Sequence, residues 1–183
     1  MKGALEAFAE STTDKSLIGD FERILLSGQR AFQRDFFDDG HFTGSAWLVS
    51  TDGERVLLTL HRKLGRWLQL GGHADGDGDL ARVALREATE ESGLAGLAVE
   101  GMIFDVDRHP IPAHGTEPAH YHYDVRYVVR ATSDERYTVS DESIDLRWWP
   151  VEEVIRDDSV DASLKRMANR WLDRAGAAAI RAR

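Results

Sequence analysis

The chain has 183 residues, which fits one domain with a sizeable core, and no cysteine, which excludes disulfides, a thiol nucleophile and a cysteine zinc site. Its formal net charge of −9 disfavours binding to nucleic-acid polymers, and any anionic substrate must be received by local cations or a metal ion. With no apolar stretch of signal-peptide length at the N-terminus and no run of about 18 apolar residues, we expect a cytoplasmic protein that does not contact membranes.

Residues 3–38 are predicted to form an N-terminal helical arm with Asp14 as an N-cap. The apolar residues of the arm recur at spacings of three and four, namely Leu17, Phe21, Ile24, Leu25 and Phe32. The arm either packs on the sheet or mediates a homodimer, and packing is the preferred interpretation. We therefore expect a single domain over 1–183, with the arm at 1–40 and the core and C-terminal helix at 41–183.

A β-hairpin is predicted after the arm, because SAWLVST and ERVLLTLHR flank the turn signal Asp52-Gly53. A loop rich in glycine and aspartate, LGRWLQLGGHADGDGD, then leads into a helix over 82–92 that Gly93 ends. Together these segments predict a strand, a loop and a helix in succession.

Further strands are predicted at 97–100, 102–107, 121–131 and 144–149, and two helices follow them. The segment 108–119 holds three of the four prolines and is predicted to be an irregular loop that governs substrate selectivity. This order of elements predicts an α/β fold, in which helices sandwich a mixed β-sheet.

Three carboxylates share one stretch of the helix over 82–92. Glu87, Glu90 and Glu91 lie at helical spacing beside Arg86, so the acids project into one small volume and repel. Glu90 and Glu91 also fall in the last turn, where the helix dipole disfavours anions. A divalent cation would relieve this repulsion, and oxygen ligands of this kind suit Mg²⁺.

The same segment resembles the signature of the Nudix hydrolases, G-x5-E-x7-R-E-U-x-E-E-x-G-U, where U is a bulky apolar residue. We call residues 72–94 the box. The positions that match are Gly72, Arg86, Glu87, Glu90, Glu91, Gly93 and Leu94. Ala88 is smaller than usual, and Gly78 stands where the family has its first glutamate. The resemblance implies an α/β/α sandwich and hydrolysis that depends on Mg²⁺, or on Mn²⁺ in its place.

The resemblance also implies roles for individual residues. Glu87, Glu90, Glu91 and the Gly71 carbonyl are the expected metal ligands, and Glu87 also serves catalysis by orienting water. Arg86 is expected to orient Glu87 or Glu90 through a charge-assisted bond.

The acid that is missing at Gly78 has two candidate substitutes. Asp77 and Asp79 flank the gap, and either one swings inward or both cap the turn. Another acid, Glu142, precedes the last strand with Asp141 behind it. This region resembles the loop from which many Nudix enzymes draw another acid, so the resemblance implies Glu142 as a further metal ligand or general base; the alternative is an acidic surface turn.

Four of the seven histidines, His109, His114, His120 and His122, lie in or beside the segment 108–119. His120 and His122 would share one face of a strand. They are assigned to a polar substrate pocket together with Arg62 and with His73, which follows the double glycine Gly71-Gly72. A zinc pair is the alternative for the two strand histidines.

The leading functional prediction is a Mg²⁺-dependent hydrolase of a nucleoside diphosphate linked to another group. The missing glutamate motivates a second reading, a sensor that binds a nucleotide derivative with weak turnover. A third reading is a diphosphate isomerase that shares the fold. It is disfavoured because the chemistry of such isomerases usually resembles that of a cysteine–glutamate acid–base pair, and this chain has no cysteine.

Overall fold

The computed structural model describes the backbone of residues 1–181 and the side chains of residues 1–174. The helices are α1 (Lys2–Ala9), α2 (Lys15–Leu25), the 3-10 helix η1 (Gly28–Phe32), α3 (Leu80–Ser92), α4 (Val151–Arg156) and α5 (Ala162–Arg181). The strands are β1 (His41–Val49), β2 (Arg55–His61), β3 (Trp67–Leu68), β4 (Leu70–His73), β5 (Leu97–Ile111), β6 (His120–Ala131) and β7 (Ser143–Pro150). Within the described residues, no helix is long and apolar enough to cross a membrane.

The strands form one mixed sheet in the order β3-β2-β1-β6-β5. β1 and β6 are parallel, whereas the other pairs are antiparallel. Near its start β1 also pairs with β4, and β2 pairs with β7. The parallel pair β1–β6 therefore lies at the centre, where both faces are covered, and all nine residues of β1 are buried.

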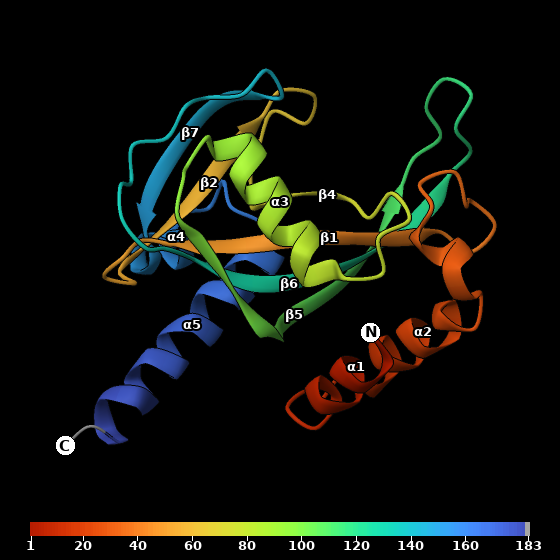
Figure 1. The fold of residues 1–183 in the computed structure, drawn as a ribbon, viewed down its shortest axis with the longest axis horizontal. Helices are drawn as coiled ribbons and strands as arrows, with labels where there is room; N and C mark the ends of the chain where they lie inside the picture. The colour runs from red at the N-terminus through yellow and green to blue at the C-terminus, as the bar shows by residue number, and fades with distance from the viewer. Residues whose placement is uncertain (182–183) are drawn as a thin grey trace.

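Helices cover both faces of the sheet, so the predicted α/β/α sandwich is confirmed (Figure 1). On one face, α3 and the N-terminal arm pack on alternate residues of the central strands such as Phe42 and Val125. On the other face, α4 and α5 pack on Trp47 and Val128, which point the opposite way. The two apolar layers explain why the central strands read as nearly continuous hydrophobic runs.

The arm packs on the sheet, which was the preferred of the two interpretations. Asp14 caps α2 by accepting a hydrogen bond of 2.9 Å from the Leu17 amide, which confirms the predicted N-cap. Phe21 contacts Tyr123 edge-on at 5.3 Å between ring centroids, and Phe32 stacks on Phe42 at 4.9 Å. Aromatic pairs of this kind stabilise beyond their buried area, so the arm is firmly seated on the sheet.

The loop predicted before α3 contains two short strands, and this is a correction. β4 forms because Gly71 and Gly72 let it approach β1 and α3 closely. A Cβ at Gly71 would lie 2.2 Å from Ser45 Oγ, and one at Gly72 would lie 2.5 Å from the carboxyl carbon of Glu87. The double glycine is therefore a packing requirement as well as a flexible loop signal.

The predicted loop 108–119 is shorter than expected. β5 continues to Ile111, pairing Pro110 with Tyr121 and Ile111 with His120, so the irregular tip is confined to 112–119. β5 is also one strand with register shifts between Val99 and Asp105, where two strands were predicted. The bulges around the exposed Met102 bend the strand without ending it, and proline is tolerated because β5 lies at the edge of the sheet.

Candidate functional site

A cavity of about 570 Å³ opens beside the start of β1, on the face of the sheet that carries His122 and Asp124. Polar residues from strands, loops and α3 line it. They include Arg34, Arg62, Lys63, Gly71, Gly72, His73, Glu87, Glu91, His109, His122, Asp124, Asp141 and Glu142. The cavity thus brings together most of the residues that the sequence assigned to chemistry, although they lie as far apart as residues 62 and 142.

Two glutamates of α3 face this cavity. Glu91 is buried and accepts a hydrogen bond of 2.7 Å from the Gly71 amide, so the double glycine and the helix are joined directly. Glu87 lies against Gly72. The third acid, Glu90, is exposed and does not belong to the cavity lining, although its charge acts on both neighbours. The helix ends at Gly93, whose φ of +67° is the left-handed C-cap expected of glycine.

The carboxylates are held where ionisation is unfavourable. Burial raises the pKa of Glu91 to about 8, and the charges of Glu87, Glu142 and Glu90 add to this effect. Burial also raises the pKa of Glu87, against the opposing effect of Arg86. A cluster of oxygen donors that repel each other is suited to a hard divalent cation, which would lower these pKa values and hold the acids ionised.

Arg86 joins the helix to β4. Its guanidinium donates to Glu87 Oε1 at 2.6 Å and to the His73 carbonyl at 2.8 Å. Of the two partners that the sequence offered for Arg86, the structure therefore selects Glu87. The bond fixes the orientation of the Glu87 carboxylate relative to the double glycine.

The gap at Gly78 is not filled by its neighbours. Asp77 accepts two hydrogen bonds from the Arg82 side chain at 2.6 and 2.7 Å, and Asp79 caps α3 by accepting from the Arg82 amide at 3.1 Å. Among the described residues, no atom other than those of Gly78 and its two chain neighbours lies within 4 Å of where a Cβ of Gly78 would be. Asp77 also closes the turn by accepting from the Asp79 amide at 2.8 Å, so neither aspartate swings inward, and the second of the two alternatives applies.

The loop before β7 brings a further acid to the cavity. Glu142 and Asp141 are exposed at its wall. Arg62 holds this loop, because its side chain donates to the carbonyls of Asp141 at 2.9 Å and Ser143 at 2.7 Å. Arg62 was assigned to substrate binding. The structure shows its guanidinium holding the loop that carries Glu142.

A buried ion network underlies the cavity and was not predicted. Arg126 donates to Asp124 at 2.7 Å and to Asp105 at 3.1 Å, and all three side chains are at most 3% exposed. Asp124 also accepts from the hydroxyls of Thr43 and Ser45. These residues come from three strands, so their pairing is visible only once the sheet is assembled.

The histidines gather beside the network. His73, His109 and His122 line the cavity, and His120 stacks on His41 at 4.9 Å between ring centroids. His41 is buried at the start of β1 and was missed by the sequence analysis, since it lies far from the other histidines in the chain. Outside this cluster, His114 is exposed at the tip of the β5–β6 hairpin.

The electrostatic state of the clustered rings follows from their burial. Burial lowers the pKa of His41 to about 4, although a backbone hydrogen bond with Phe36 opposes it. Burial and the neighbouring histidines lower the pKa of His122 to about 2. Both rings are therefore neutral near pH 7, with a free nitrogen lone pair on each.

The model of the NUDIX domain matches residues 41–171, which is more than half of the chain. The chain belongs to the Nudix family. By class it is a Nudix-type pyrophosphohydrolase, and the family resemblance drawn from the box is confirmed. The arm before residue 41 lies outside the matched range. A comparison with curated proteins found no match.

Solved structures of Nudix proteins share the fold. A NUDIX-family hydrolase from Clostridium perfringens is 27% identical, with 73% of this chain and 96% of that chain covered and a TM-score of 0.54. An Ap4A hydrolase from C. elegans, in a binary complex, is 16% identical, with 74% and 98% covered and a TM-score of 0.59. The NUDIX domain of Shewanella oneidensis NrtR, complexed with ADP ribose, is 19% identical, with 84% and 98% covered and a TM-score of 0.54.

Proposed function

We propose that this protein is a Mg²⁺-dependent hydrolase that cleaves the diphosphate linkage of a nucleoside diphosphate joined to a second group. The observation that supports this proposal most strongly is the pair of partly and fully buried acids, Glu87 and Glu91, beside the double glycine on one cavity wall. Folding alone would not select such a pair, because their burial without a cation is costly.

The residues present fit a hard cation. Glu87, Glu90, Glu91 and the Gly71 carbonyl would hold Mg²⁺, with Mn²⁺ as the other candidate, and Glu90 would reach it from the rim. Bound there, the metal neutralises phosphate oxygens and activates water. The Gly71 amide already fixes Glu91 Oε1, which leaves the second carboxylate oxygen free to serve as a ligand.

The other side chains would bind and orient the reactants. Glu142 lines the same cavity and would serve as the general base or as a further ligand, and Arg62 holds its loop. Arg86 orients Glu87, which helps to position the attacking water. Arg34 and Lys63 also line the cavity and would receive the diphosphate charges. The substrate contacts proposed from the sequence, His73, His120, His122 and Arg62, stay proposals.

The proposal is tested with a panel of nucleotides that includes ADP-ribose and Ap4A, the compounds named for two proteins of similar fold. We expect phosphate-containing products with Mg²⁺ and none in excess chelator. Glu91→Gln is expected to lower kcat by about 100-fold or more, because removal of a metal ligand removes stabilisation of the transition state. Glu142→Gln is expected to lower kcat without altering the affinity for Mg²⁺ if Glu142 is the base.

A matched control is Glu152→Gln, which makes the same change at an exposed acid on α4. It should leave kcat unchanged. Full activity in chelator, or Glu91→Gln turning over like the parent, would contradict the metal assignment. If the chain binds one compound of the panel and hydrolyses none, the sensor reading that Gly78 motivated replaces this proposal.

A further inference from the structure

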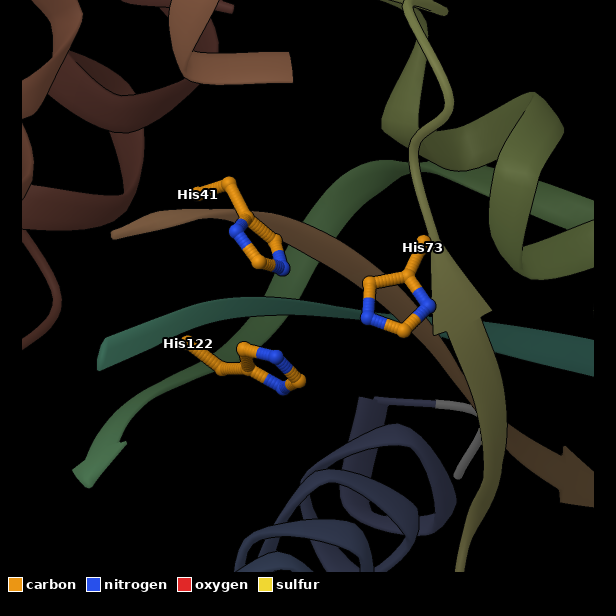
Figure 2. A group of neighbouring side chains, drawn as sticks. All are labelled: His41, His73 and His122. Carbon is orange, nitrogen blue, oxygen red and sulfur yellow. The ribbon is translucent and has the colours of Figure 1, made fainter. Parts of the chain in front are cut away.

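Three histidines from three neighbouring strands point toward one another (Figure 2). His41 lies on β1, His73 on β4 and His122 on β6. Their ring centroids are 4.7 to 5.2 Å apart, and each ring offers a nitrogen within 4.8 Å of the other two. The strand register explains the meeting, because His41 pairs with His122 directly and His73 pairs with Thr43, two residues along β1.

One ring nitrogen in this cluster is buried and has no partner. His41 is 1% exposed, and its Nε2 makes no hydrogen bond within the part of the chain that the structure describes. Its Nδ1 lies 3.3 Å from the Phe36 carbonyl, which places the proton on Nδ1 and leaves a lone pair on Nε2. A buried polar atom that makes no hydrogen bond destabilises the fold, and a ligand on this nitrogen would remove that penalty.

The contact with Phe36 is also the arrangement that a metal-binding histidine uses. A ligating imidazole usually donates its other N–H to a carbonyl or carboxylate, and that bond fixes the tautomer and the ring orientation. His41 makes the contact before any metal is present. His109, next to His122, makes a similar contact, because its Nδ1 lies 3.2 Å from the Asp107 carboxylate.

We propose that His41, His73 and His122 form a second metal site, specific for a zinc-class transition-metal ion and separate from the carboxylates of the box. Imidazole nitrogens suit Zn²⁺, Ni²⁺ and Cu²⁺, whereas Mg²⁺ prefers oxygen. Tetrahedral ligands of Zn²⁺ stand roughly 3.3 Å apart, so small side-chain rotations close the cluster around the ion. The fourth position faces the cavity, because His73 and His122 line it.

The site therefore lies on the same cavity as the box carboxylates but differs from them in ligand chemistry. A substrate oxygen or a water would complete the coordination of the ion. In place of the zinc pair considered from the sequence, His120 with His122, the proposal has a triad that includes His41, 81 positions before His122 in the chain. His120 supports the triad by stacking on His41.

The test uses the full chain freed of metal, with Co²⁺ as a spectroscopic probe. We expect one equivalent to give the strong visible absorption of tetrahedral Co²⁺, and Zn²⁺ but not Mg²⁺ to displace it. His122→Ala and His73→Ala should each weaken Co²⁺ binding by at least about tenfold. His114→Ala makes the same change at an exposed histidine and should leave binding unchanged. Glu91→Gln should also leave the absorption intact while it weakens Mg²⁺ binding.

Several results would overturn the proposal. These are absence of tetrahedral absorption, unchanged Co²⁺ affinity in both histidine variants with native circular dichroism, or loss of the absorption in Glu91→Gln. Binding of inorganic phosphate without Co²⁺ binding, abolished by His73→Ala, would show an anion pocket instead. Because His73 lies on the short strand β4 and is only partly buried, its variant tests the site even if His122→Ala does not fold.

Discussion

Glu91 is an acid that the folded protein buries at a cost. Its pKa in the folded state is about 8, above the ordinary 4.5, so the folded protein keeps a proton that the unfolded chain releases. In chelator, the free energy of unfolding should therefore fall as the pH rises from about 4.5 to about 8. Urea denaturation at about pH 5 and about pH 9 should show this fall in the parent protein and a much smaller one in Glu91→Gln.

Mg²⁺ provides the control for this prediction. At about pH 9 it should restore the stability of the parent, because it compensates the buried charge, and should restore little in Glu91→Gln. Equal pH dependence of the two proteins would contradict the assignment of the raised pKa to Glu91.

The open space at Gly78 leads to a second prediction. Asp79 caps α3 and Asp77 is paired with Arg82, so the position of the missing acid is vacant and has room for a side chain. Gly78→Glu should lower the Mg²⁺ concentration for half-maximal activity by about threefold or more, since it restores the acid that the Nudix signature has at this position. Asp79→Asn should leave that concentration unchanged, as asparagine also caps helices. A higher Mg²⁺ requirement in Asp77→Asn or Asp79→Asn would show that an aspartate already serves the metal.

Residues of the box could be placed from sequence because helical spacing is local. Residues three and four apart lie on one side of a helix wherever that helix packs, so Glu87 and Glu91 were expected to share one side of the helix. His41 could not be placed in this way. Its partnership with His122 depends on the parallel register of β1 and β6, which no local pattern specifies.

At the scale of elements, the arm holds the loop of residues 74–78, which is the part of the box that precedes α3. The Gly76 amide donates to the Phe32 carbonyl at 2.7 Å, and Arg34 pairs with Asp75 through two bonds of 2.5 Å. Arg34→Gln should therefore raise amide hydrogen exchange in residues 74–78 by about two- to fivefold, a modest effect because the pair is partly exposed. Exchange measured by mass spectrometry tests this.

Arg23→Gln is the matched control, because Arg23 is an exposed arginine of the same arm that pairs with Asp20. It should leave exchange in the loop unchanged. Equal exchange in the parent protein and in both variants would mean that the remaining contacts hold the loop without Arg34, namely the bond between Gly76 and Phe32 and the Gln29 side-chain bond to the Gly76 carbonyl at 2.5 Å.

The elements themselves were predictable to different degrees. The Asp52-Gly53 hairpin and the box helix carry strong local signals, and both occur as expected. β4 carries no local strand signal, because two consecutive glycines are typical of a loop. The strand needs glycine there because the backbone packs closely against Ser45 and Glu87. Pro110 also lies in a strand that local signals did not predict. It belongs to the edge strand β5 because the segment pairs with β6, a long-range contact.

At the scale of the whole molecule, the sandwich follows from element order, but the polar contact between its layers does not. Arg166 of α5 donates to Asp105 at 2.8 Å and to Asp107 at 3.1 Å. Arg166 follows Asp105 by 61 residues and Asp107 by 59, and they meet only because α5 returns across β5. The formal charge of −9 does not predict that Asp105 and Asp124 are buried together with Arg126, because net charge carries no information on which charges pair.

This network should dominate the stability of the sheet beneath the cavity. Arg126 is fully buried and pairs with Asp105, Asp107 and Asp124 at 2.7 to 3.5 Å. Arg126→Met removes the shared cation and leaves buried carboxylates partly unpaired, which should cost about 3–5 kcal/mol in chemical denaturation. Arg130→Met, four residues along β6, breaks the more exposed pair with Glu100 and should cost about 1 kcal/mol or less. Equal losses in the two variants would contradict the central role of Arg126. A larger loss for Arg126→Met that shrinks at low pH would support that role, because protonated aspartates no longer need the cation.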